Sequence, residues 1–169
     1  MGLFMTVELS CALERVTGMK VAELHFFRNG QLLHLKCHLI QNCESPVGVG
    51  CRASFELFAF HASWRFVKDS RVCLADSTLR DWESHTASEV AEAVTKETCD
   101  TVIAKVQLCT KTLDLDVHFS NQSVLSLFSL TNYGSNWGSY SVVVEDQLFQ
   151  CASSGKVAEV AIEVLERDR

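Results

Sequence analysis

Residues 21–35 read VAELHFFRNGQLLHL, and residues 113–127 read LDLDVHFSNQSVLSL. Each stretch ends a strand on a Phe, turns at an Asn followed by a small or polar residue, and restarts on an aliphatic pair. Asn-Gly between apolar runs is the strongest short signal for a two-residue hairpin turn. The repeated pattern therefore predicts a β-hairpin scaffold and does not indicate a catalytic motif.

Further strands are predicted along the rest of the chain. Residues 53–60 become apolar on both faces at their end, which predicts a central strand. The other expected strands are 19–27 with 31–40, 61–67 with 71–75, the meander 102–108, 113–119 and 124–130, and 140–144 with 147–151. On the hairpin after residue 61, four apolar side chains are expected to share one buried side: Trp64, Phe66, Val72 and Leu74.

Helical signals are fewer. The segment TASE at residues 86–89 is a capping box, in which the Thr86 hydroxyl caps an amide and Glu89 reaches back. Apolar residues follow it at helical spacing. A short helix is also expected over residues 7–16, ended by Gly18, whereas residues 156–166 suit either a helix or a strand. These patterns predict an α+β fold of antiparallel hairpins and a meander with one or two helices.

Length and element order bear on domain organisation. With 169 residues, the chain is expected to form one domain, residues 1–169. The first and second halves of the chain share an order of predicted elements: a helical start, a hairpin, and then a short hairpin whose first strand begins near an aromatic residue. That residue is Trp64 in the first half and Tyr140 in the second. This order leads to the hypothesis of two pseudo-repeated halves, residues 1–80 and 81–169.

The composition narrows the classes of partner. The net charge of −6 and the pI near 5.5 disfavour general nucleic-acid binding, because an acidic surface repels phosphates. The same charge suits a basic protein partner. No apolar stretch approaches the roughly 20 residues that span a bilayer, so we expect no membrane partner.

Eight cysteines are present. Residues 1–16 do not resemble a secretory leader, because Glu8 and Glu14 interrupt the apolar runs. Several cysteines lie in apolar strand patterns, among them Cys73 and Cys109, where a thiol acts as a small hydrophobe. We therefore expect mostly reduced and buried cysteines in a cytoplasmic protein.

Three patterns together suggest a family. They are LDLDVHF at residues 113–119 before an Asn turn, VLSLF at 124–128, and a Trp64-led strand followed by Asp76. This layout resembles small bacterial immunity proteins, which are encoded beside polymorphic or contact-dependent growth-inhibition toxins. The chain departs from that layout in its many cysteines and in the long loop at residues 41–51.

The resemblance implies a function without catalysis or a cofactor: binding a cognate toxin and blocking it. Many such toxins are nucleases with basic clefts, which an acidic inhibitor can occupy in place of phosphates. The expected partner-binding residues are Asp76, Asp81, Trp82, Glu83 and Trp137, because aromatic anchors in a charged rim suit an interface. The alternative is that both tryptophans pack onto the core.

Other chemistry is less well supported by the sequence. His34, Cys37 and His38 lie close together, but their spacing matches no zinc module, and on a strand Cys37 faces away from both histidines. No cysteine or histidine lies in a recognisable nucleophile elbow, so we expect no enzyme and no metal.

One alternative function is a small-ligand-binding or enzymatic β-rich domain with a site lined by His25, His34 or Cys37. Another is a module that assembles through a strand edge, and the sequence leaves the oligomeric state open.

Overall fold

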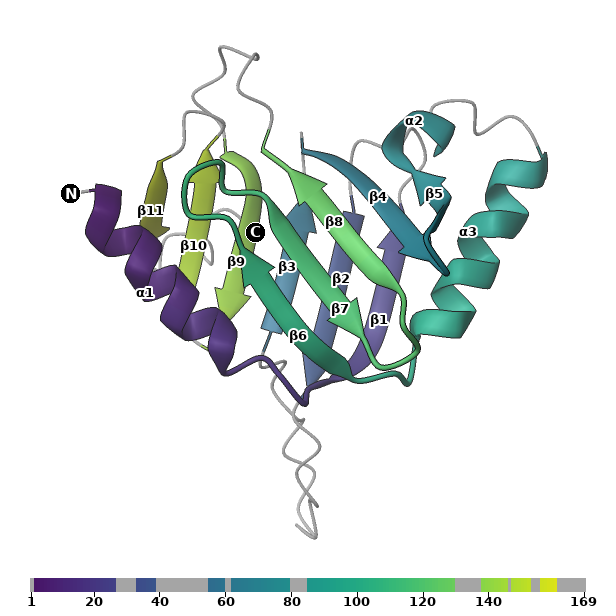
Figure 1. Ribbon diagram of the computed structural model, residues 1–169, viewed down its shortest axis with the longest axis horizontal. Coiled ribbons are helices and arrows are strands. Elements are labelled where there is room, and N and C mark those ends of the chain that lie inside the picture. The colour runs from purple at the N-terminus through teal and green to yellow at the C-terminus, as the bar shows by residue number, and fades with distance from the viewer. Residues whose placement is uncertain are drawn as a thin grey trace, which may run out of the picture.

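Two antiparallel β-sheets face one another in the computed structural model (Figure 1). The structure describes residues 2–26, 33–38, 55–59, 62–79, 85–129, 138–145, 147–152 and 156–160. Two long helices, one single-turn helix and eleven strands fall within these ranges. The predicted α+β class, with antiparallel hairpins and a meander, is confirmed.

The six-stranded sheet has the order β1-β2-β3-β9-β10-β11. Its strands are β1 (Lys20–Phe26), β2 (Leu33–His38), β3 (Phe55–Ala59), β9 (Gly138–Val144), β10 (Gln147–Ala152) and β11 (Val157–Val160). The predicted hairpin pairs β1–β2 and β9–β10 are confirmed. β3 lies between β2 and β9, as expected of a central strand. In the ambiguous segment 156–166, the described residues form a strand.

The five-stranded sheet has the order β5-β4-β8-β7-β6. Its strands are β4 (Ser63–Lys68), β5 (Arg71–Ala75), β6 (Ile103–Leu108), β7 (Leu115–Phe119) and β8 (Val124–Phe128). The predicted meander β6-β7-β8 and hairpin β4–β5 are both present. Pairing of β4 with β8 joins the two parts of the chain in this sheet, as pairing of β3 with β9 does in the other.

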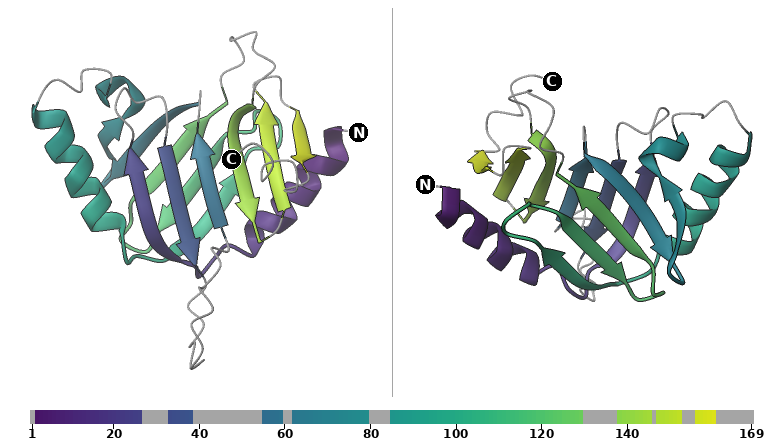
Figure 2. Two further views of the ribbon diagram at one scale, coloured as in Figure 1. Left: turned by 180° about the vertical axis from the view of Figure 1, so that it is seen from behind. Right: turned by 45° about the horizontal axis from the view of Figure 1, so that its top comes forward.

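Helices close the two open sides of the sandwich. α1 (Gly2–Glu14) contacts the edge strands β11 and β6, and α3 (His85–Thr98) contacts the opposite edges, β1 and β5 (Figure 2). The single turn α2 (Asp76–Leu79) packs against β5 and α3. Bare strand edges offer unpaired backbone groups to other chains, so this cover protects the sheets from edge pairing. The predicted capping residue Thr86 is the second residue of α3, because the helix begins at His85.

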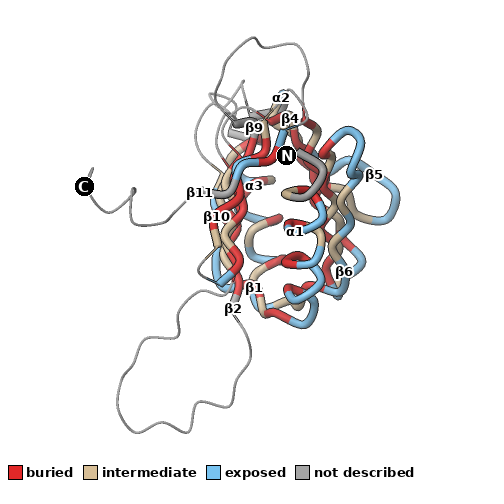
Figure 3. The backbone as a smooth tube through the Cα atoms, turned by 90° about the vertical axis from the view of Figure 1, so that its left-hand side faces the viewer, coloured by how far each residue is buried: buried red, intermediate tan, exposed pale blue. Residues whose placement is uncertain are grey.

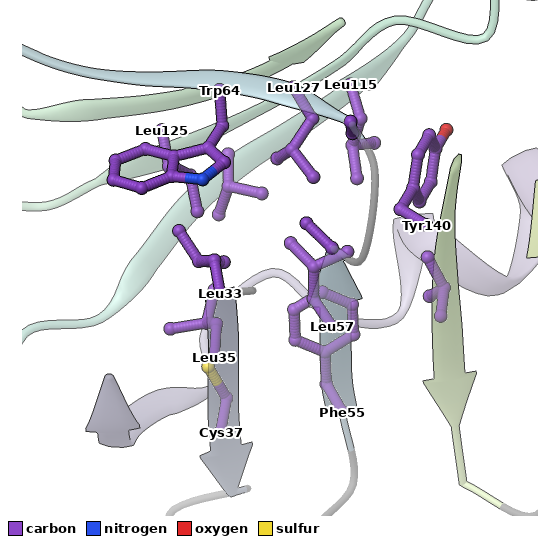
Figure 4. Packing of buried hydrophobic residues seen from close by; sticks show 14 of the residues in the cluster. Leu33, Leu35, Cys37, Phe55, Leu57, Trp64, Leu115, Leu125, Leu127 and Tyr140 are labelled. Atoms are coloured by element: carbon purple, nitrogen blue, oxygen red, sulfur yellow. The ribbon is translucent and has the colours of Figure 1, made fainter. Parts of the chain in front are cut away.

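Apolar side chains of both sheets fill the space between them (Figure 4). In β2 the inward-facing residues Leu33, Leu35 and Cys37 are fully buried, as the two-residue period of a strand requires. Trp64 and Tyr140 are the largest fully buried side chains that the structure describes. Seen along the layers, the two sheets stand apart with α1 between their edges (Figure 3).

The starts of β1 and β6 are hydrogen-bonded to each other, and we call residues 18–21 and 100–103 the strand-start junction. Its backbone bonds are Gly18 N to Ile103 O (2.8 Å), Ile103 N to Met19 O (2.8 Å), Val21 N to Thr101 O (2.8 Å) and Asp100 N to Val21 O (3.1 Å). The bonds run between edge strands of different sheets. The junction therefore fixes one sheet relative to the other at this end of the sandwich.

β1 and β6 are also built alike. β1 has a register shift between Val21 and Glu23, and β6 has one between Ile103 and Lys105, 82 residues further along in each case. The strand order β1-β2-β3-β9-β10 likewise matches β6-β7-β8-β4-β5 element by element. In this correspondence β7–β8 matches β2–β3, so the two stretches quoted at 21–35 and 113–127 are both hairpins but not equivalent ones. Repeated halves 1–80 and 81–169 stay a prediction.

One predicted core position is wrong. Trp64, Phe66 and Leu74 are buried, but Val72 is 56% exposed. The pairing of β4 with β5 shifts between Phe66 and Val67, so that Leu74 lies opposite Phe66 and Val72 lies opposite Val67. This bulge inserts one extra residue and turns Val72 to the outer face.

Gly18 and Asp100 follow the two long helices and both have positive φ, at 90° and 70°. No atom lies within 4 Å of a Cβ added at Gly18, so space does not restrict the position. We expect Gly18→Ala to lower the free energy of unfolding by about 1 kcal/mol through backbone strain alone. Urea denaturation followed by circular dichroism measures this change.

Asp100→Gly is the matched control, because it relieves the same strain. Its ion pair with Lys20 is largely exposed (Nζ–Oδ1 2.6 Å) and contributes little. We expect unchanged or higher stability. A loss for Asp100→Gly as large as that for Gly18→Ala would contradict the strain argument.

Candidate functional site: the outer ladder and the groove beside it

Of the five predicted partner-binding residues, the structure describes Asp76. It begins α2 and is half-buried, and Ser63 Oγ donates a hydrogen bond to Asp76 Oδ2 (3.1 Å). This bond joins the start of α2 to β4, which gives Asp76 a structural role. The other four residues, Asp81, Trp82, Glu83 and Trp137, lie outside the described residues, so the acidic and aromatic cluster stays a prediction.

The outer face of the six-stranded sheet carries another group of polar and aromatic side chains, which we call the outer ladder. Its members are Glu23 and His25 of β1, His34 and Lys36 of β2, and Glu56 and Phe58 of β3. The residues that alternate with them, such as Leu35 and Leu57, are fully buried between the sheets. The ladder therefore lies on the face that points away from the core.

Three rings form one row of the outer ladder. His25 lies opposite His34, and His34 lies opposite Phe58. The ring centroids of His25 and His34 are 6.2 Å apart with an angle of 27° between the planes. Those of His34 and Phe58 are 4.3 Å apart and nearly parallel, at 8°. The row is a continuous stack across three strands.

Carboxylates and one ammonium form the second row. Glu23 Oε2 lies 3.3 Å from His25 Nε2, and Glu56 Oε2 lies 3.3 Å from His34 Nε2. Lys36 Nζ lies 4.0 Å from Glu56 Oε1. The His25 side chain is 55% exposed, and that of His34 is 18% exposed. The ladder thus combines flat ring faces with hydrogen-bond acceptors, a combination that suits a planar cation.

A groove of about 360 Å³ adjoins the outer ladder, between β1 and α3. We call it the helix–strand groove, and its lining residues are Leu24, His25, Phe26, Ser88, Ala91, Glu92, Thr95 and Lys96. Thr95 Oγ1 donates to the carbonyl oxygen of Leu24 (3.3 Å), which satisfies an edge acceptor of β1. His25 belongs to both the ladder and the groove, so the two form one continuous surface.

The alternative site lined by His25, His34 or Cys37 does not form as a single cavity. His25 and His34 lie on the outer face, whereas Cys37 is fully buried on the inner one. Burial, with a smaller effect from Cys99, raises the pKa of the Cys37 thiol far above its ordinary value. In the described part of the chain, no three His, Cys, Asp or Glu side chains are arranged to hold a metal ion.

The described cysteines are free thiols in different environments: Cys11, Cys37, Cys73, Cys99, Cys109 and Cys151. Cys37 and Cys151 are buried, as expected. Cys73 and Cys109 are exposed, so their predicted burial is wrong. Cys73 is the extra residue of the bulge in the β4–β5 pairing, and Cys109 lies just beyond the end of β6.

Sequence reasoning named His25 and His34 but missed Glu56 and Phe58. The Asn29-Gly30 turn signal sets a pairing in which His25 faces His34, so that contact could be predicted. Glu56 and Phe58 follow a long intervening segment, and only the observed pairing of β2 with β3 brings them to the histidines.

Comparison with protein-family models, with curated proteins and with solved structures gave no match to this chain. Among the helices that the structure describes, none is both long and apolar enough to cross a membrane.

The thiol environments predict different rates of alkylation at pH 7.5. The Thr112 hydroxyl and the backbone N–H groups of Thr112 and Lys111 lower the pKa of Cys109, so more of it is thiolate. Burial raises the pKa of Cys151 to about 12. Among the six cysteines that the structure describes, we expect iodoacetamide to modify Cys109 first and to leave Cys37 and Cys151 unmodified until unfolding, as measured by peptide mass spectrometry.

Thr112→Val is the matched variant, because it removes the hydroxyl and leaves the backbone donors. We expect slower alkylation of Cys109 and no change at the other thiols. Modification of Cys37 as fast as that of exposed Cys11 would contradict the assigned burial.

Proposed function

We propose that this protein is a binding protein without catalytic activity, and that it recognises a basic protein partner through the outer ladder. The observation that carries the proposal is the continuous stack of His25, His34 and Phe58 beside the carboxylates of Glu23 and Glu56. A regular sheet holds these groups in a fixed order. Binding surfaces built on strands keep their geometry more accurately than those on loops.

An arginine side chain of the partner fits this chemistry best. Its planar guanidinium stacks on aromatic faces and donates paired hydrogen bonds to a carboxylate. The stack offers the face, and Glu23 offers an acceptor that is 48% exposed. Glu56 shares its carboxylate with His34 and Lys36, so it contributes less net charge to the surface.

The overall charge supports the same kind of partner. A net charge of −6 gives a field that attracts a basic protein and speeds its encounter. Aromatic residues surrounded by charged ones also match the common arrangement of interface anchors within a polar rim.

The resemblance to immunity proteins specifies the partner further as a cognate toxin. In this form of the proposal, the protein binds the toxin over its basic substrate cleft or beside it, and binding blocks the toxic activity. A standard interface of this kind buries about 800 Å² on each partner.

Binding to the product of the adjacent gene tests the proposal. We expect one-to-one, nanomolar binding that weakens with salt and abolishes the neighbour's toxicity. Glu23→Lys should weaken binding by about tenfold, chiefly through slower association, because it reverses an exposed charge at the anchor. Titration calorimetry measures the affinity, and stopped-flow fluorescence measures the rate of association.

A second variant, Glu56→Gln, removes the carboxylate beside His34, and Asp116→Asn is its matched control. Both variants remove one half-buried carboxylate from an outer sheet face, but Asp116 lies on β7 of the other sheet. We expect Glu56→Gln to weaken binding more than Asp116→Asn does. Equal effects, or binding without protection from the toxin, would refute the assignment of the outer ladder.

A further inference from the structure

The helix–strand groove between α3 and β1 has an equivalent region between α1 and β6, where protein side chains fill the space. α3 lies against β1 as α1 lies against β6, and each helix leads into its strand through the strand-start junction. The 82-residue correspondence at the junction extends back along the helices. Buried Ala12 of α1 and buried Val16, which follows α1, correspond to Val94 and Thr98 of α3, which are also buried. The two helices can therefore be compared position by position.

The comparison shows larger residues on α1. Leu9 and Leu13 stand where α3 has Ala91 and Thr95. Both leucines are buried, at 0% and 3% exposed, so they fill the space between α1 and the core. Ala91 is also buried, at 4% exposed, but its side chain is smaller than that of Leu9, and together with half-buried Thr95 it lines the helix–strand groove. The groove is thus open where the same chain, at the equivalent place, inserts aliphatic side chains.

We propose that the helix–strand groove binds a leucine-sized aliphatic side chain on a basic segment of the partner protein. We infer an aliphatic side chain because the leucines Leu9 and Leu13 fill the equivalent space beside α1. This inference rests on the proposed function for the protein nature and basic charge of the partner.

Charge and continuity support the same occupant. Glu92 and Lys96 both line the groove, and on the adjoining outer ladder the carboxylates of Glu23 and Glu56 lie beside the single ammonium of Lys36. The continuous surface therefore carries one more carboxylate than ammonium. A segment that places an aliphatic side chain in the groove would bring the basic residue beside it to the outer ladder, because His25 belongs to both surfaces. The apolar side chain and the neighbouring charge would then occupy adjoining sites.

Two short peptides test the groove without the natural partner. The probes are acetyl-Lys-Leu-Lys-amide and acetyl-Lys-Ala-Lys-amide, titrated into the full chain while its backbone amide resonances are recorded. We expect the leucine peptide to shift the amides of Phe26 and Ala91 and to bind about tenfold more tightly than the alanine peptide. Equal affinities, or shifts spread over unrelated surfaces, would overturn the proposal.

Thr95→Leu copies the α1 side chain into the groove. We expect this variant to bind the leucine and alanine peptides with equal affinity and to keep the amide spectrum of a folded protein. Ser88→Leu fills the other end and serves the same purpose if Thr95→Leu fails to fold through loss of its bond to Leu24. Unchanged peptide binding in a folded variant would overturn the proposal.

Two further outcomes separate the hypotheses. A concentration-dependent dimer that Thr95→Leu abolishes would show that a second copy of this chain occupies the groove, and it would overturn the proposed occupant. Selective leucine-peptide binding, together with no binding to the product of the adjacent gene, would leave the groove site standing and remove the toxin partner.

Discussion

The strand-start junction determines how the two sheets are placed. Its four backbone hydrogen bonds join residues 18–21 to residues 100–103, which lie far apart in the sequence and lead into different sheets. Each of the two segments follows a helix that packs against both sheets. The position of α1 is therefore coupled to the start of β1, and that of α3 to the start of β6. The positive φ values of Gly18 and Asp100 let the chain leave each helix and enter this pairing.

The helices protect strand edges, but they do so unequally. Beside β6, α1 inserts leucine side chains, and the exposed remainder of its surface includes Val7, which is 55% exposed. Beside β1, α3 satisfies edge backbone groups with polar atoms, as in the bond from Thr95 to Leu24, and leaves the helix–strand groove. Both solutions prevent edge pairing with another chain. Edge protection alone does not require the groove, so its shape is available for binding.

Local signals predicted the hairpins and the meander, because turn residues and two-residue alternation act over a few positions. Asp114 and Asp116 alternate with buried Leu113 and Leu115 as their sequence indicates. Pairings across long separations, such as β3 with β9, depend on packing that no local pattern encodes. For the same reason Phe58 could not be placed beside His34 in advance. The bulge that exposes Val72 has no sequence signal of its own, since residues 72–75 are continuously apolar and do not show which of them face inward.

The outer ladder has a counterpart on the outer face of β6 and β7 in the other sheet. The two have the same strand pairing but different side chains. Positions 82 residues beyond Glu23, His25 and His34 hold Lys105, Gln107 and Asp116, on strands with the same register shift. The scaffold therefore accepts either set of side chains on its outer faces. A stacked pair of histidines with carboxylate partners is not needed to form the sheet, because the core side chains on the other face of the strands hold it together. The composition of the ladder is thus free to be determined by what it contacts, which is why we place partner recognition there and not on the opposite sheet.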